Sequence, residues 1–88
     1  MGTIDDRERR LGRILDALGE ALTESERDEI EMFLSACEYG VALETLCDIL
    51  IEEARSLPKS VFAEIVELAE LMGIRDVVVT NELCRLVP

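Results

Sequence analysis

The sequence predicts an all-α fold: a small single-domain bundle of four main helices, a short C-terminal extended segment and a final helical turn. Apolar residues recur three and four positions apart along most of the chain, which is the spacing of one helical face. Residues that start or stop helices interrupt this spacing at Thr23, Gly40, Pro58 and Gly73. The chain has 88 residues, so we expect one domain spanning residues 1–88.

The first two helices have clear local signals. We expect the first over residues 5–22, with an apolar face formed by Leu11, Ile14, Leu15, Leu18 and Leu22. Its arginines are mixed with acids, which favours a solvated face over an anion-binding patch. The second helix is expected to begin after Thr23, because Thr23 and Glu26 have the spacing of a capping box. Its apolar face comprises Ile30, Phe33, Leu34 and Cys37.

The third and fourth helices follow Gly40 and Pro58. We expect Gly40 to end the second helix in a left-handed conformation and the third helix to span residues 41–55. The core face of this helix comprises Leu43, Leu46, Cys47, Leu50 and Ala54. Pro58 is expected to open a fourth helix over residues 58–72, and Gly73 to end it.

The C-terminal residues are expected to pack on the bundle. Residues 77–79 are three valines, which are β-prone, but one short strand has no partner in a helical bundle. We therefore expect an extended segment there. Thr80 or Asn81 then caps a short final turn that runs to Leu86.

The negative charge is concentrated in the middle of the chain. Residues 23–54 carry ten acids and one base, Arg27, which is a net charge of −9 out of −11 for the whole chain. Acids at i and i+4, such as Glu44 and Asp48, destabilise a helix by about 0.2–0.5 kcal/mol per pair. Such dense charge also repels itself in the compact state, so its retention points to a basic partner.

The composition argues against several classes of function. The chain has no histidine, and its three cysteines include no C-x-x-C pair, so we expect no metal site and no cofactor. It contains no Ser-His or Cys-His nucleophile and no acid in a recognisable pocket, so we expect it not to be an enzyme. The net charge opposes nucleic-acid binding.

The sequence also predicts a cytoplasmic location. No apolar run approaches the roughly 20 residues that a membrane-spanning helix needs. Residues 1–6 contain no apolar core of a secretion signal.

One stretch of the sequence is distinctive. After the acidic capping sequence at residues 22–26, it reads Tyr39-Gly40-x-Ala42-Leu43-Glu44-x-Leu46-Cys47-Asp48. In this respect the chain resembles the MafI-type immunity proteins, and the resemblance covers about residues 11–74. These are small cytosolic proteins encoded beside polymorphic toxins, including those of contact-dependent inhibition systems. The resemblance implies binding and neutralisation of a cognate toxin's catalytic domain, and many such toxins are nucleases with basic surfaces.

The acids are therefore expected to form a partner-binding surface. The predicted partner-binding residues are Glu24, Asp28, Glu31, Glu38, Tyr39, Glu44, Asp48 and Glu52. Tyr39 is interpreted either as an interface anchor or as a packing residue. The expected partner is one toxin domain bound by one copy of the chain, without nucleic acid, membrane or metal. Three alternatives remain: an acidic helical adaptor for another basic protein surface, a soluble structural subunit, and acids that only keep the protein in solution.

Overall fold

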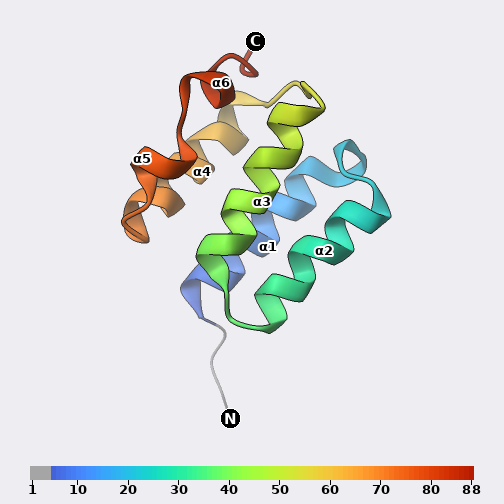
Figure 1. The fold of residues 1–88 in the computed structure, drawn as a ribbon, viewed down its shortest axis with the longest axis vertical. Helices are drawn as coiled ribbons and strands as arrows, with labels where there is room; N and C mark the ends of the chain where they lie inside the picture. Colours follow the sequence, from blue (N-terminus) through green and yellow to red (C-terminus); the bar gives the residue numbers. More distant parts are fainter. Residues whose placement is uncertain (1–4) are drawn as a thin grey trace.

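The computed structural model of the chain describes residues 5–88, which form helices and connecting turns without a strand (Figure 1). The elements are α1 (Asp6–Leu18), the 3₁₀ turn η1 (Gly19–Ala21), α2 (Glu24–Ser35), α3 (Tyr39–Glu52), α4 (Lys59–Leu71), α5 (Arg75–Val78) and α6 (Asn81–Cys84). The prediction of an all-α bundle with four main helices is confirmed. The start of the chain, from which the absence of a secretion signal was inferred, lies partly outside the described residues.

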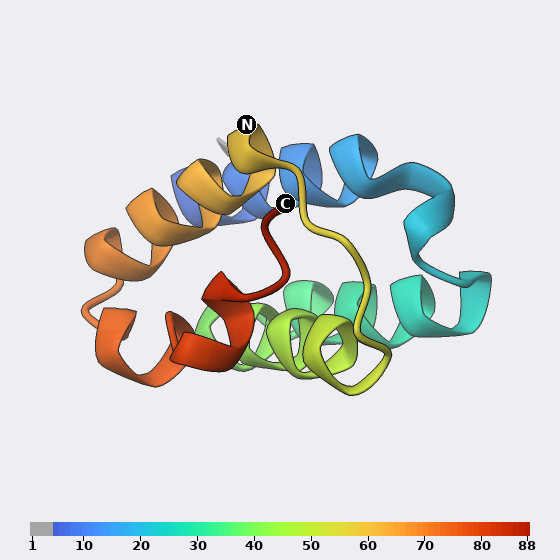
Figure 2. The ribbon, with the colours of Figure 1, turned by 90° about the horizontal axis from the view of Figure 1, so that it is seen from above.

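The helices form two layers. Figure 2 shows α1 and α4 in one layer, and α2, α3 and the two short C-terminal helices in the other. Apolar side chains from both layers fill the space between them, and the most completely buried include Leu11, Ile14, Leu15, Leu43, Leu46, Leu50, Leu57, Ile65 and Leu68. The predicted apolar faces of α1 and α3 account for most of these residues, because residues three and four apart share one helical face.

Side-chain caps fix where three helices begin. The Thr23 hydroxyl accepts from the Glu26 amide at 3.1 Å, and the Glu26 carboxylate accepts from the Thr23 amide at 2.9 Å. The capping box predicted for α2 is therefore confirmed. The carboxylate of Asp5 caps α1 by accepting from the Arg7 amide, and Thr80 caps α6 through the Leu83 amide.

Three helices end in the Schellman motif, in which the chain turns through one left-handed residue. After α4 this residue is Gly73 (φ 72°), and the Ile74 amide donates to the Ala69 carbonyl at 2.9 Å, as predicted. After α2 and α3 the left-handed residues are Cys37 (φ 60°) and Ala54 (φ 46°). Neither is a glycine, so both pay a steric cost that glycine avoids.

The predicted role of Gly40 is wrong. Gly40 is the second residue of α3 and has no positive φ, because the left-handed turn occurs three residues earlier at Cys37. The turn leaves Cys37 exposed, and the corresponding turn at Ala54 also exposes that side chain. Both residues were predicted on core faces, and both lie beyond the helix that would have placed them there.

The boundaries of two further segments differ from the predictions. The first helix ends at Leu18 rather than at residue 22, because Gly19 takes a positive φ (49°) and starts η1. Arg75–Val78 forms a helical turn, so the extended part of the tail is limited to Val79 and Thr80. The tail then returns to the bundle, where the Leu57 amide donates to the Leu86 carbonyl at 2.9 Å.

Candidate partner-binding surface

The charged middle of the chain folds into one structural unit. Helices α2 and α3 lie side by side and antiparallel (Figure 1), and we call residues 23–54 the acidic hairpin. A short turn joins the helices at one end. At the other end, Arg55 donates to both carboxylate oxygens of Glu26, at 2.6 and 3.1 Å, and to the carbonyl of Ala21 at 2.8 Å. The base that follows the hairpin thus holds the start of α2 to the end of α3.

Among the described residues, most acids of the acidic hairpin have no cation beside them. Within residues 5–88, two of its ten acids form ion pairs, Glu26 with Arg55 and Glu31 with Arg27. The Glu26–Arg55 pair lowers the pKa of Glu26 to about 2, chiefly through the hydrogen bonds that Arg55 donates. The eight acids without an ion pair in this part of the chain are Glu24, Asp28, Glu29, Glu38, Glu44, Asp48, Glu52 and Glu53. Their charge is not neutralised within the fold.

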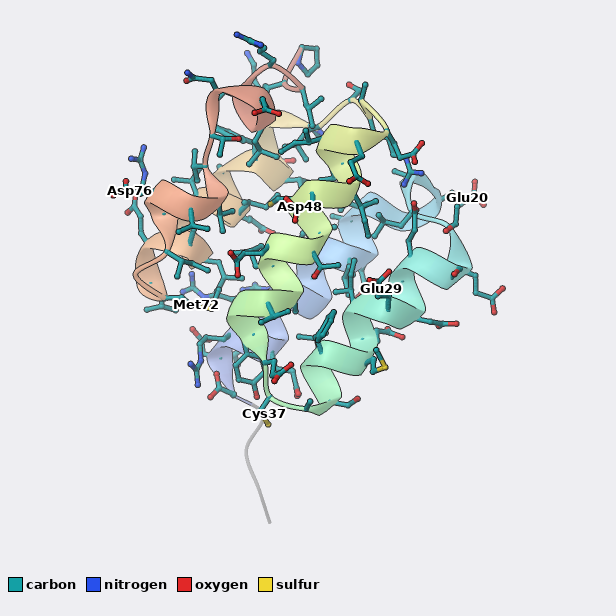
Figure 3. All side chains as sticks on the ribbon, viewed as in Figure 1. Glu20, Glu29, Cys37, Asp48, Met72 and Asp76 are labelled. Atoms are coloured by element: carbon teal, nitrogen blue, oxygen red, sulfur yellow. The ribbon has the colours of Figure 1, made fainter. Side chains whose placement is uncertain are left out.

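Three of the predicted partner-binding acids, Glu44, Asp48 and Glu52, form a ridge along α3. Asp48 and Glu52 are exposed, whereas Glu44 is half-buried. Figure 3 shows Asp48 on the side of α3 that faces the viewer. Because these acids are four residues apart, they follow one another along the helix.

The acids of α2 lie on different sides of the helix. Glu31 lies toward α1, because its ion-pair partner Arg27 also reaches Asp16 of α1, with a nitrogen–oxygen distance of 2.8 Å. Glu29 instead lies on the face of the molecule that carries Asp48 (Figure 3). Glu31 was predicted to belong to the site, whereas Glu29 was not. Glu29 is four residues before Phe33 of the predicted apolar face, and this spacing places Glu29 beside that face.

A hollow of about 80 Å³ lies between α3 and the C-terminal segment. Its lining residues are Glu44, Cys47, Asp48, Ile51, Val77, Val78 and Thr80. Two of the predicted partner-binding acids thus stand at a cavity, beside residues from the tail. The contribution of the tail was not predicted from the sequence, because it depends on how α5 packs against α3.

Tyr39 lies under another side chain. Only 7% of its surface is exposed, and the guanidinium carbon of Arg7 lies 4.7 Å from the centre of its ring. Arg7 is held in turn by the carboxylate of Asp5. The neighbouring Cys37 thiol and burial raise the pKa of Tyr39 to about 12. This geometry supports the packing interpretation of Tyr39 rather than the anchor interpretation.

The opposite layer carries a mixed-charge surface. A smaller hollow of about 30 Å³ lies between α1 and α4, lined by Arg10, Arg13, Glu64 and Glu67. Acids and bases are interspersed there, unlike on the acidic hairpin. Within residues 5–88, no group of three or more Cys, Asp or Glu side chains is arranged to hold a metal ion.

Comparison of the chain with protein-family models, curated proteins and solved structures gives no match. No helix in the described part of the chain is long and apolar enough to cross a bilayer. The function is therefore inferred from the charge, burial and shape of the molecule itself.

Proposed function

We propose that this protein is an immunity protein that binds and neutralises a basic toxin domain, such as a nuclease, through the acidic hairpin. One observation carries the proposal: the acidic hairpin holds a net charge of −9 out of −11, and eight of its ten acids have no ion pair in the described structure. A protein that needed charge only for solubility would gain as much from acids spread over its whole surface.

Electrostatics explains how such a surface would serve neutralisation. Complementary charge on two proteins speeds their encounter and disfavours wrong partners. A toxin that acts on nucleic acid needs a basic surface to hold phosphates. An acidic surface that binds there competes with the substrate for the same cations. The resemblance to MafI-type immunity proteins, carried by residues 39–48, points to the same class of partner.

The decisive experiment takes the protein product of the gene next to this protein's gene and tests whether it is a toxin that this protein binds and neutralises. The double variant Glu44→Lys/Asp48→Lys should keep the fold, because Asp48 is exposed, Glu44 is only half-buried, and neither has an ion pair in the described structure. Its affinity for the toxin should fall by several kcal/mol, since close interfacial charge pairs couple by roughly 1.5–7 kcal/mol. Wild-type association should also slow as salt is added.

The matched control is Glu64→Lys/Glu67→Lys on α4. It changes the net charge by the same amount on the opposite layer, beside Arg10 and Arg13. New repulsion at exposed positions costs less than about 1 kcal/mol per pair, so this variant should fold and protect cells. Thermal melts of both variants verify folding before affinity is compared.

The outcomes separate the proposal from its alternatives. Co-purification with the toxin, and loss of protection by the α3 variant alone, support immunity. If the α3 variant protects cells as well as the wild type, the ridge is only solvated surface. If the wild type binds a basic protein that is not a toxin and gives no protection, the chain is an adaptor instead.

A further inference from the structure

We propose that the hollow between α3 and α5 is the receptor for a single lysine or arginine side chain of the protein partner. This inference rests on the proposed function, because it assigns the partner's contact to a specific place on the acidic hairpin. It also adds residues of the C-terminal segment, notably Val77, to the binding surface.

The shape of the hollow suits the end of one side chain. Its volume of about 80 Å³ well exceeds the roughly 10–15 Å³ that one water requires. Ile51 and Val78 give it apolar walls, and Val77, which is 58% exposed, stands at its edge. Such walls can pack against the methylene groups of a lysine or arginine, which bury their stems while the charged head stays near the surface.

The floor of the hollow is uncharged. Cys47 lines it and is 2% exposed. Burial, and secondarily the nearby charge of Asp48, raise the pKa of Cys47 to about 12, so its thiol stays protonated at neutral pH. The negative charge of the hollow therefore comes from the carboxylates of Glu44 and Asp48.

These two carboxylates have no cationic partner in the part of the chain that the structure describes. Glu44 and Asp48 lie one helical turn apart on α3, so their side chains stand beside each other. No arginine or lysine of the described residues is within ion-pair distance of either one. Glu44 is also half-buried, which strengthens its attraction for a cation by reducing the water around it. A basic side chain from outside would supply the missing charge.

The alternatives fit less well. A metal site built wholly from side chains needs three or more ligand residues, and residues 5–88 present no such group. A wholly apolar ligand would cover Glu44 and Asp48 without pairing them, which is costly. An aliphatic cation satisfies both the apolar walls and the two acids, and arginine in particular is enriched among interface hot spots.

The first test measures the hollow without any toxin. Acetyl-arginine methylamide is titrated into the isotope-labelled protein, with acetyl-norleucine methylamide as the uncharged control probe. The arginine probe should shift the amide resonances of Glu44, Asp48, Val77 and Thr80 more than those of the other acids of the acidic hairpin. Equal shifts at all exposed acids, or no shift at any concentration used, would overturn the inference.

The second test blocks the hollow while leaving the charge unchanged. Val77→Phe places a larger side chain at its edge, and Leu71→Phe is the matched control. Leu71 is also an exposed apolar residue, 57% against 58%, but it does not line the hollow. Val77→Phe should abolish the resonance shifts and weaken toxin binding by about tenfold or more, whereas Leu71→Phe should change neither.

The two proposals fail in different ways. If Val77→Phe binds the toxin normally while Glu44→Lys/Asp48→Lys does not, the acidic hairpin is the interface but the hollow is not the receptor. If the arginine probe binds in the hollow but the toxin does not bind at all, the receptor is real and the immunity function is wrong. If free protein self-associates in sedimentation experiments and Val77→Phe prevents it, the occupant is a second copy of this chain, which contradicts the proposal.

Discussion

Replacing Ala54 by glycine should stabilise the protein, although such a change usually destabilises. Ala54 follows the last turn of α3 with a φ of 46°, and its amide donates to the Ile51 carbonyl at 3.1 Å. The next amide, that of Arg55, donates to the Leu50 carbonyl at 3.0 Å and completes the Schellman motif. The side chain of Ala54 is exposed, so its removal leaves no cavity.

The magnitude follows from two opposing effects. A non-glycine residue in the left-handed region costs roughly 1–2 kcal/mol, which Ala54→Gly relieves. Glycine also makes the unfolded chain more flexible, which costs about 0.4–1 kcal/mol. The net gain should be about 0.5–1 kcal/mol. In a domain of this size it corresponds to an increase in Tm of about 2–8 °C.

Urea and thermal denaturation followed by circular dichroism measure this gain. The matched control is Ala63→Gly, at an exposed position inside α4, which should lose about 0.5–1 kcal/mol because glycine is unfavourable within a helix. The same chemical change should thus have opposite signs at the two sites. If Ala54→Gly destabilises as much as Ala63→Gly, then α3 does not end in a left-handed residue and the reasoning is refuted.

Three further predictions concern the core, the start of α3 and the ion pair between Arg55 and Glu26 of α2. Leu46→Ala should cost about 2–5 kcal/mol in urea denaturation, because Leu46 is fully buried; a loss below 1 kcal/mol would contradict its place in the core. Gly40→Ala should leave stability unchanged or raise it by up to about 1 kcal/mol in the same assay, because a Cβ there would meet Ile74 at an ordinary 3.8 Å. Strong destabilisation would indicate that Gly40 has a left-handed conformation. Arg55 lowers the pKa of Glu26 from 4.5 to about 2. The contribution of the ionised Glu26 carboxylate to stability is therefore fully present above pH 4.5 and is lost as the pH falls toward 2. Glu26→Gln keeps the capping box but cannot titrate, so its stability should fall less steeply over this pH range; a profile identical to the wild type would show that the pair is not formed.

Local chemistry determined which parts of the fold could be predicted from the sequence. The capping box at Thr23 and Glu26 depends on residues three apart, and Gly73 is the usual residue for a left-handed turn, so both features were predicted correctly. Cys37 and Ala54 perform the same turn without glycine. Their residue types do not indicate a left-handed turn. The end of the second helix was therefore predicted at the nearby glycine, Gly40, which was wrong.

The candidate site also has features that the sequence predicts and features that it does not. The concentration of acids could be read directly from the composition of residues 23–54. The hollow could not, because it exists only where Val77 and Thr80 pack beside α3, about thirty residues away along the chain. The burial of Tyr39 likewise depends on Arg7, which belongs to another helix. These contacts between distant segments leave no periodic pattern in the sequence.

The hydrogen bonds that Arg55 donates to Glu26 and Ala21 reduce the entropy that would be lost when a partner binds. With a short turn at one end and Arg55 at the other, α2 and α3 cannot separate unless those hydrogen bonds break. A partner that binds the acidic hairpin would therefore meet a backbone that is already ordered. The backbone entropy of the two helices was already lost on folding, so binding has to order only the acidic side chains and more of the contact energy remains available as affinity.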